Sequence, residues 1–305
     1  MIYENASARH LGFARIVVFG VLLVRLLLDP LEQLANFPFG AFLPHGPLQF
    51  IPDAWMNSLL AAGHLFAFKW IYAGVLLLCL VGAGPRCPVM LTAICGTVFY
   101  DGLAKGFGGH INHQELIVTH CAILLVLFPC YDGLSVNHLI RRKDRNTATT
   151  QQLAAYRLAL RALCFWITLT YFFVGLARIS SSGAKGYFTN TINFYALQQS
   201  LRWGYWDVSL ARHLLDQKWL QILLSVSFPL ATLLEIAAPL AVFIRKLTIP
   251  IVLSLLVFHT MIFLFMNFFF WQNMVLLSLF FAAFVGRETE QRCDEASGSG
   301  IVFSG

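Results

Sequence analysis

The sequence predicts an all-α protein that crosses a membrane several times, and three observations lead to this fold class. Hydrophobic residues make up 58% of the 305 positions and charged residues only 12%, whereas soluble domains are about 25% charged. Apolar runs such as 219–244 exceed the length of about 20 residues that a spanning helix needs. These runs also lack the alternation of membrane β-strands, which extend over only about 10 residues. We therefore expect a polytopic transmembrane helical bundle.

Eight apolar stretches are expected to form the spans, because each is long enough to cross the hydrocarbon core as a helix. A seven-span alternative stays open, since residues 249–285 are nearly continuous, but the basic residues Arg287 and Arg292 favour eight. The expected spans are residues 11–28, 57–82, 87–104, 113–130, 156–178, 219–244, 248–266 and 268–286.

The distribution of basic residues predicts the orientation. Residues 29–56 contain no lysine or arginine, whereas the loop after the fourth expected span carries Arg141, Arg142, Lys143 and Arg145. By the positive-inside rule the basic loop is cytoplasmic and residues 29–56 lie outside. Alternation then places both termini in the cytoplasm. The first ten residues lack the basic region of a signal peptide, so the first stretch is expected to remain as a span.

An aromatic-rich segment, residues 183–217, is too polar to cross the membrane. Aromatic side chains of this kind gather at the headgroup level, so we expect an outer interfacial or re-entrant segment, with an ordinary exposed loop as the alternative. Its aromatic residues are Tyr187, Phe188, Phe194, Tyr195, Trp203, Tyr205 and Trp206. The domain organisation is then one transmembrane domain over residues 1–290, followed by a polar tail over 291–305 that ends like an added linker.

Ionisable residues inside expected spans are the candidate functional groups, because they are costly in lipid. Counted along the topology, His113 and Glu115 open the fourth span, Arg178 closes the fifth, and His259 lies in the outer half of the seventh. Glu235 lies near the middle of the sixth span. This distribution predicts a water-accessible pocket near the outer leaflet in which a histidine acts as acid, base or orienting group. The alternative is that these groups only hydrogen-bond one another to hold the bundle together.

Three further charged residues have simpler interpretations. Arg15 is a candidate partner for Glu235, whereas Arg25 and Lys69 are expected to extend their charged ends toward the membrane surface. The net charge of +6 is better explained by topology than by nucleic-acid binding. No metal site is expected, because the His110–His113 pair lacks further ligands and no CxxC spacing occurs.

Five stretches in one order resemble the membrane module of vitamin K-dependent gamma-carboxylase and its bacterial relatives, the horizontally transferred transmembrane (HTTM) family. No single stretch is specific, but the ordered set covers most of the chain. The stretches are Phe13-Ala14-Arg15-Ile16, Ile111-Asn112-His113, Tyr171-Phe172-Phe173-Val174-Gly175-Leu176-Ala177-Arg178-Ile179, Leu234-Glu235 followed by Pro239, and Phe258-His259.

The resemblance implies a membrane enzyme that uses a reduced, vitamin K-like quinone and acts on a peptide at the outer face, in a bacterial inner membrane. The catalytic residues would be His113, His259 and Arg178, and the cofactor would contact Asn112, Glu235, Tyr171 and Trp203. The family places a lysine base where this chain has Arg178. Arginine stays protonated in proteins, so this residue would stabilise negative charge instead.

Two other classes of function remain open at this point. The chain could be a non-catalytic membrane protein that binds or transports a peptide or a lipid, or a structural subunit whose polar residues only fix packing. Membrane lipids are expected partners in all these cases. A secreted peptide is expected for the enzyme and for the binding or transport protein, and nucleic acid is not expected.

Overall fold

The computed structural model describes residues 7–107, 113–140, 149–187, 191–203, 213 and 216–280, with the side chains of 113, 114, 182–187, 191, 202 and 203 left out. Within these ranges the regular structure is entirely helical. Six of the described helices are long and apolar enough to cross a membrane. The all-α membrane fold is confirmed, whereas the count of eight spans stays a prediction.

The chain forms two compact units. The first contains residues up to Leu163 together with Leu279–Gly305, and the second contains Cys164–Ser278. Helix α7 (Thr150–Tyr187) begins in the first unit and continues into the second. This helix extends beyond the expected span of 156–178 at both ends. The predicted tail, residues 291–305, lies outside the described residues.

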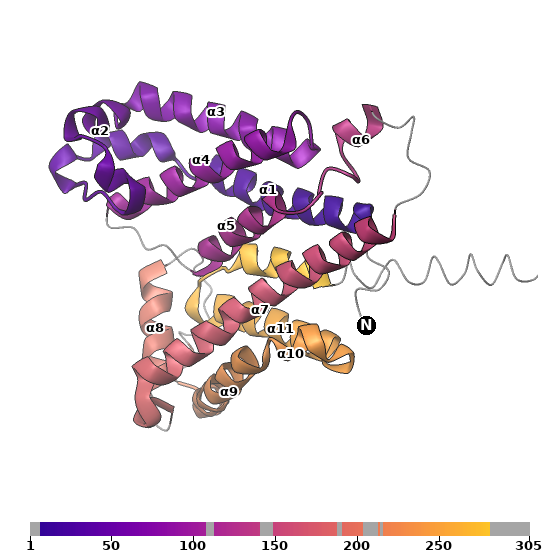
Figure 1. Cartoon of the computed structure of the whole chain (residues 1–305). Helices are drawn as coiled ribbons and strands as arrows, with labels where there is room; N and C mark the ends of the chain where they lie inside the picture. The colour runs from indigo at the N-terminus through magenta and orange to yellow at the C-terminus, as the bar shows by residue number, and fades with distance from the viewer. Residues whose placement is uncertain are drawn as a thin grey trace, which may run out of the picture. The chain divides into compact units, whose positions relative to one another are not determined.

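In the first unit, four helices lie side by side: α1 (Ala8–Leu28), α3 (Ala62–Val81), α4 (Arg86–Gly106) and α5 (His113–Val126) (Figure 1). A segment of short helices joins α1 to α3. It consists of η1 (Leu31–Asn36), η2 (Phe39–Ala41), η3 (Gly46–Phe50) and α2 (Asp53–Leu59). Another short helix, α6 (Val136–Ile140), follows α5.

Arg15 of α1 is fully buried and binds three backbone carbonyls. Its guanidinium donates hydrogen bonds to the oxygens of Cys130 at 2.8 Å, Leu134 at 2.6 Å and Leu80 at 3.3 Å. Helix α3 ends beside it at Gly82, which has the left-handed φ of +67°. A Cβ at Gly82 would lie 2.6 Å from Nη1 of Arg15. Arg15 therefore holds together α1, the end of α3 and the segment after α5.

Arg25 does not extend to the surface as expected, because its acidic partners are close by in the folded unit. Its guanidinium lies 2.7 Å from Oδ1 of Asp101 and 3.6 Å from Oε1 of Glu115. The Tyr100 ring lies 4.7 Å away and adds a cation–π contact. Lys69 is likewise held within the unit, by Glu32 at 3.3 Å and the Asp29 carbonyl at 2.8 Å.

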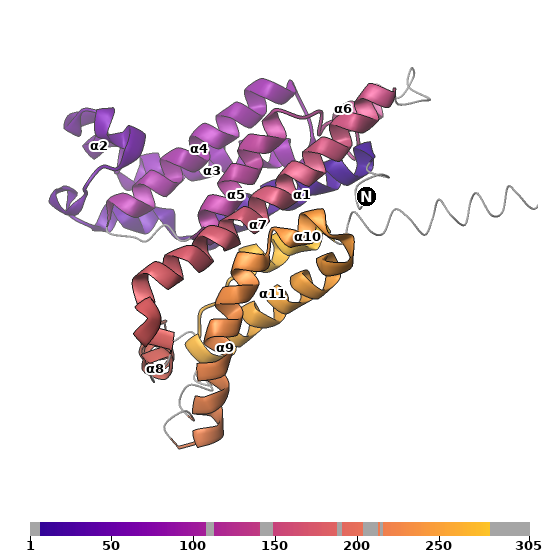
Figure 2. The same ribbon diagram turned by 60° about the horizontal axis from the view of Figure 1, so that its bottom comes forward.

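The second unit contains α8 (Thr191–Trp203), α9 (Lys218–Ala237), α10 (Leu240–Phe243), α11 (Arg245–Met266) and residues 271–278 of a helical stretch over 271–280 (Figure 2). The sequence predicts one helix over 219–244, but α9 ends at Ala237. Pro239, which has no N–H to donate, lies two residues further on, after the helix-capping residue Ala238. Prolines also lie inside α9 (Pro229) and α11 (Pro250).

The break between the last two expected spans is a helix cap at Asn267. This residue has the left-handed φ of +57°, a conformation in which asparagine is enriched at helix ends. The expected interfacial segment is only partly described. Helix α8 exposes Phe194 and Tyr195, while the side chains of the segment's other five aromatic residues lie outside the described residues. Its place at the membrane surface stays a prediction.

Candidate functional site

One face of α7 carries three residues of the stretch 171–179. Tyr171, Gly175 and Arg178 follow one another at i, i+4 and i+7, so they share a helical face. Gly175 has no room for a side chain, since a Cβ there would lie 2.9 Å from Cγ1 of Ile236 and 3.2 Å from Cβ of Glu235. The glycine thus lets α9 approach α7 closely, between the two polar residues.

Arg178 forms an ion pair with Glu235 across this contact. Nη2 of Arg178 lies 2.9 Å from Oε1 of Glu235, and the two side chains are 21% and 2% exposed. The second carboxylate oxygen, Oε2, has no hydrogen-bond partner among the described residues. Removing either partner of a buried ion pair is costly, because the other charge is left uncompensated. Glu235 pairs with a buried arginine, and that arginine is Arg178 rather than Arg15.

Tyr171 and His259 form a buried hydrogen bond. The Tyr171 hydroxyl lies 2.7 Å from Nε2 of His259, and both residues are at most 1% exposed. The His259 ring packs against Phe258 and Phe270, with ring centroids 5.5 Å and 5.3 Å away. A phenol and an imidazole in this arrangement can share a proton, whose position depends on the imidazole tautomer.

Two buried amides, Gln272 and Asn273, belong to the same unit and were missed by the sequence analysis. Both are at most 4% exposed. Asn273 lies close to the phenol of Tyr171, yet neither of its amide atoms forms a well-aligned hydrogen bond with a described residue. Amides are uncharged, so the criterion of ionisable side chains within apolar stretches does not select them. Two adjacent amides within the apolar stretch 268–286 were the signal that could have revealed them.

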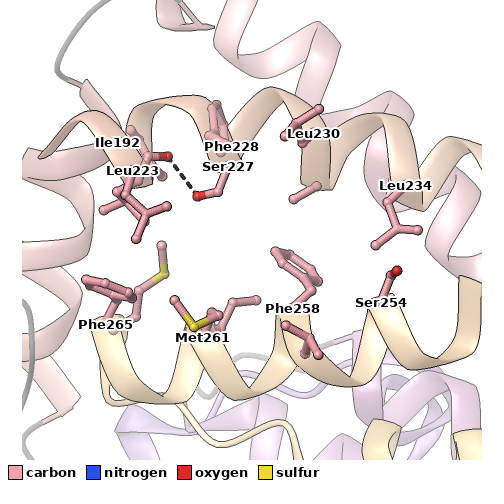
Figure 3. Close-up of a pocket in the computed structure, with 15 residues that line it drawn as sticks. Ile192, Leu223, Ser227, Phe228, Leu230, Leu234, Ser254, Phe258, Met261 and Phe265 are labelled. Atoms are coloured by element: carbon pink, nitrogen blue, oxygen red, sulfur yellow. Dashed lines mark hydrogen bonds between the residues drawn. The ribbon is translucent and has the colours of Figure 1, made fainter. Parts of the chain in front are cut away.

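A cavity of about 360 Å³ lies between α9 and α11, and Ile192 of α8 also lines it (Figure 3). Side chains from the two helices face each other across it, with Leu234 and Ser254 near one end and Leu223 and Phe265 near the other. Its lining is apolar apart from the hydroxyls of Ser227 and Ser254. The lining residues are Ile192, Leu223, Leu224, Ser227, Phe228, Leu230, Ala231, Leu234, Ser254, Val257, Phe258, Met261, Ile262, Phe265 and Met266.

Two of these lining residues connect the cavity to the ion pair. The guanidinium carbon of Arg178 lies 5.6 Å from the ring centroids of both Phe228 and Phe258. Phe258 also neighbours His259 in α11. Arg178 therefore lies directly behind the aromatic part of the cavity wall, and the Tyr171–His259 pair lies two helical turns away along α7.

The structure assembles four of the predicted site residues in the second unit: Tyr171, Arg178, Glu235 and His259. Asn112 and the side chains of His113 and Trp203 lie outside the described residues, so their roles stay predictions. Glu115, expected at the same pocket, binds Arg25 in the first unit instead. Among the described residues, no group of three or more histidine, cysteine or acidic side chains is placed to hold a metal ion.

Comparisons of the chain with protein-family models, with curated proteins and with solved structures find no match. The chemistry open to the site follows from its own contacts, namely an ion pair and a phenol–imidazole pair near an apolar cavity.

Proposed function

We propose that this chain is an integral membrane enzyme of the carboxylase-like group that binds a reduced, quinone-like molecule in the cavity between α9 and α11. The observation that carries the proposal is the position of Arg178, whose guanidinium contacts two rings of the cavity wall while its partner Glu235 is buried. A charged group so near an apolar cavity suits a ligand with a hydrophobic tail and a polar head.

The residues present fit such a ligand in size and in polarity. A volume of about 360 Å³ lies within the range of small-molecule pockets, and the lining suits a lipid-soluble ring or tail. Near Tyr171, Oε2 of Glu235 is a buried acceptor without a partner among the described residues, and Oδ1 of Asn273 is a buried acceptor without a well-aligned one. Buried acceptors are normally satisfied, so they favour a ligand that donates hydrogen bonds. A quinol, when bound, would supply two hydroxyl donors and the electrons of its reduced ring.

The side chains divide the work by their chemistry. Tyr171 and His259 hold a proton between Oη and Nε2, so this pair is the proposed acid–base group. Arg178 stays protonated and stabilises negative charge that develops at the ligand head. Glu235 fixes the Arg178 guanidinium through Oε1. In this proposal a secreted peptide is the second substrate, as the family resemblance implies.

A non-catalytic protein that binds or carries a lipid or peptide is the second candidate. The lining of the cavity favours it, because it contains two serine hydroxyls and no ionisable side chain. A cavity of this kind retains an apolar molecule without acting on it. The two candidates differ in what becomes of the bound molecule.

The test is to purify the full chain in mild detergent and identify the bound small molecules by mass spectrometry. Ser254→Phe fills the cavity, and Thr260→Phe is the matched control, since Thr260 is also an exposed hydroxyl residue of α11 but does not line the cavity. We expect a quinone or quinol to co-purify with the wild type and with Thr260→Phe, and to be lost from Ser254→Phe.

A second pair of variants separates enzyme from binder. Tyr171→Phe and His259→Gln should retain the ligand, because neither residue lines the cavity. Both should lose oxidation of added quinol by the molecular oxygen supplied in the assay, measured by the absorbance of the quinol, because the proposed acid–base pair is broken. If both variants oxidise quinol as fast as the wild type, the acid–base assignment is wrong. Co-purification of an unaltered lipid or peptide, with no quinol oxidation by the wild type, would establish the second candidate.

A further inference from the structure

The segment between α1 and α3 exposes large apolar side chains that none of the contacts above explains. We call residues 37–59 the aromatic platform. Three of its side chains are largely exposed, namely Phe50 at 88%, Trp55 at 70% and Leu43 at 67%. Phe37 and Leu59 are exposed as well. Large apolar groups left open in this number indicate an environment other than water.

The platform is fixed to α4 by two side chains that fit against glycines. A Cβ at Gly106 would lie 2.0 Å from the Phe42 ring, and a Cβ at Gly102 would lie 2.8 Å from Cδ1 of Leu48. The backbone N–H of Leu43 also donates a hydrogen bond to the carbonyl of Gly106 at 2.8 Å. Phe42 and Leu48 are buried, so the exposed residues between and after them are held in place rather than free to turn inward.

These anchors place the platform at the level of the span ends, not above them. Gly102 lies four residues before the end of α4, which is about 6 Å at a rise of about 1.5 Å per residue. The chain directly before the platform packs deeper still, since Lys69 binds the Asp29 carbonyl and Glu32. Lys69 lies seven residues into α3, about 10 Å from its start. The platform thus lies alongside helices that are long and apolar enough to cross a membrane.

The charge of the segment indicates which part of the membrane it fits. Residues 29–61 contain the acids Asp29, Glu32 and Asp53 and no lysine or arginine. Attraction to anionic headgroups therefore does not hold it at the surface. Tryptophan and other aromatic residues favour the zone between headgroups and acyl chains for its mixed polarity. We propose that the aromatic platform is immersed in this interfacial zone, in the leaflet where α1 ends and α3 begins.

The test measures how deeply Phe50 and Trp55 lie in a bilayer. Nitroxide labels are attached at Phe50→Cys and Trp55→Cys in the full chain, with Cys87, Cys95 and Cys293 replaced by serine, in phosphatidylcholine nanodiscs. Ile71→Cys, exposed in the middle of α3, serves as the lipid reference and Gln151→Cys near the start of α7 as the water reference. We expect labels 50 and 55 to be more accessible to oxygen than to a water-soluble nickel reagent. The ratio of the two accessibilities should lie between the values of the two references. Adding anionic lipid should leave this ratio unchanged.

Two outcomes overturn the proposal. Labels 50 and 55 that match Gln151→Cys place the platform in water. Labels protected from both reagents show that protein covers it, and the oligomeric state then distinguishes a second copy of the chain from a bound peptide. The outcome is independent of whether a quinone binds in the second unit.

Discussion

At the scale of single residues, the pair formed by Arg178 and Glu235 yields the clearest stability test. Arg178→Met leaves a buried carboxylate without its cation, which costs about 3–5 kcal/mol for pairs of this kind. The double variant Arg178→Met/Glu235→Leu removes both charges and should recover most of that loss. Thermal unfolding in detergent compares the three proteins.

The same double variant can also contradict the pairing of Arg178 with Glu235. If it is less stable than Arg178→Met alone, the two side chains do not compensate each other, and the pairing of α7 with α9 is wrong. Glu235→Leu alone serves as the remaining corner of the cycle.

The Asn273 amide gives a second residue-level prediction. Because its donor and acceptor lack well-aligned partners among the described residues, Asn273→Leu should leave the ligand-free protein as stable or more stable. The same change should weaken retention of a hydroxyl-bearing ligand, measured by co-purification. A clear loss of stability in ligand-free protein would show that other protein groups satisfy the amide.

Single residues also show where the sequence stopped being informative. Arg178, Glu235 and His259 could be identified from the sequence, because a charged or imidazole side chain within an apolar stretch is rare. Their partners could not be predicted in the same way, since pairing depends on which helices touch. Arg25 is the instructive error: its partners Asp101 and Glu115 come from α4 and α5, far along the chain.

At the scale of elements, the end of α3 can be tested with two glycines that share a backbone conformation. Gly82 and Gly84 both have positive φ, +67° and +79°, so alanine at either costs about 1–2 kcal/mol from strain alone. Only Gly82 also crowds Arg15 and Ser135. Gly82→Ala should therefore destabilise the protein more than Gly84→Ala in thermal unfolding. Equal losses would mean that Arg15 can yield to the added methyl group.

The helices themselves were largely predictable, and their ends were not. Each of the eight expected spans overlaps a described helix or the stretch over 271–280, because long apolar runs permit little else in lipid. The run 219–244 was read as one helix although it contains Pro239. Hydrophobicity does not register a missing N–H, so the division into α9 and α10 appeared only in the structure.

At the scale of the whole molecule, the predicted orientation is open to a direct test with a native cysteine. Cys87 is exposed at the start of α4, next to Arg86, on the side that the basic residues assign to the cytoplasm. In a Cys293→Ser background, a membrane-impermeant maleimide should label Cys87 in inverted vesicles and not in intact cells. Labelling in intact cells would reverse the orientation. Cys95, inside the span, should stay unreactive because the membrane-impermeant reagent does not enter the hydrocarbon core.

The proline inside α9 bears on how selective the cavity can be. Pro229 lies in the middle of one cavity wall, with lining residues before it (Ser227, Phe228) and after it (Leu230, Ala231). A helix that lacks one backbone hydrogen bond at this point bends at low energetic cost. Such a wall can follow hydrophobic tails of different thickness. Under the proposed function, discrimination between ligands then falls to the head group, and the tail contributes affinity with little specificity.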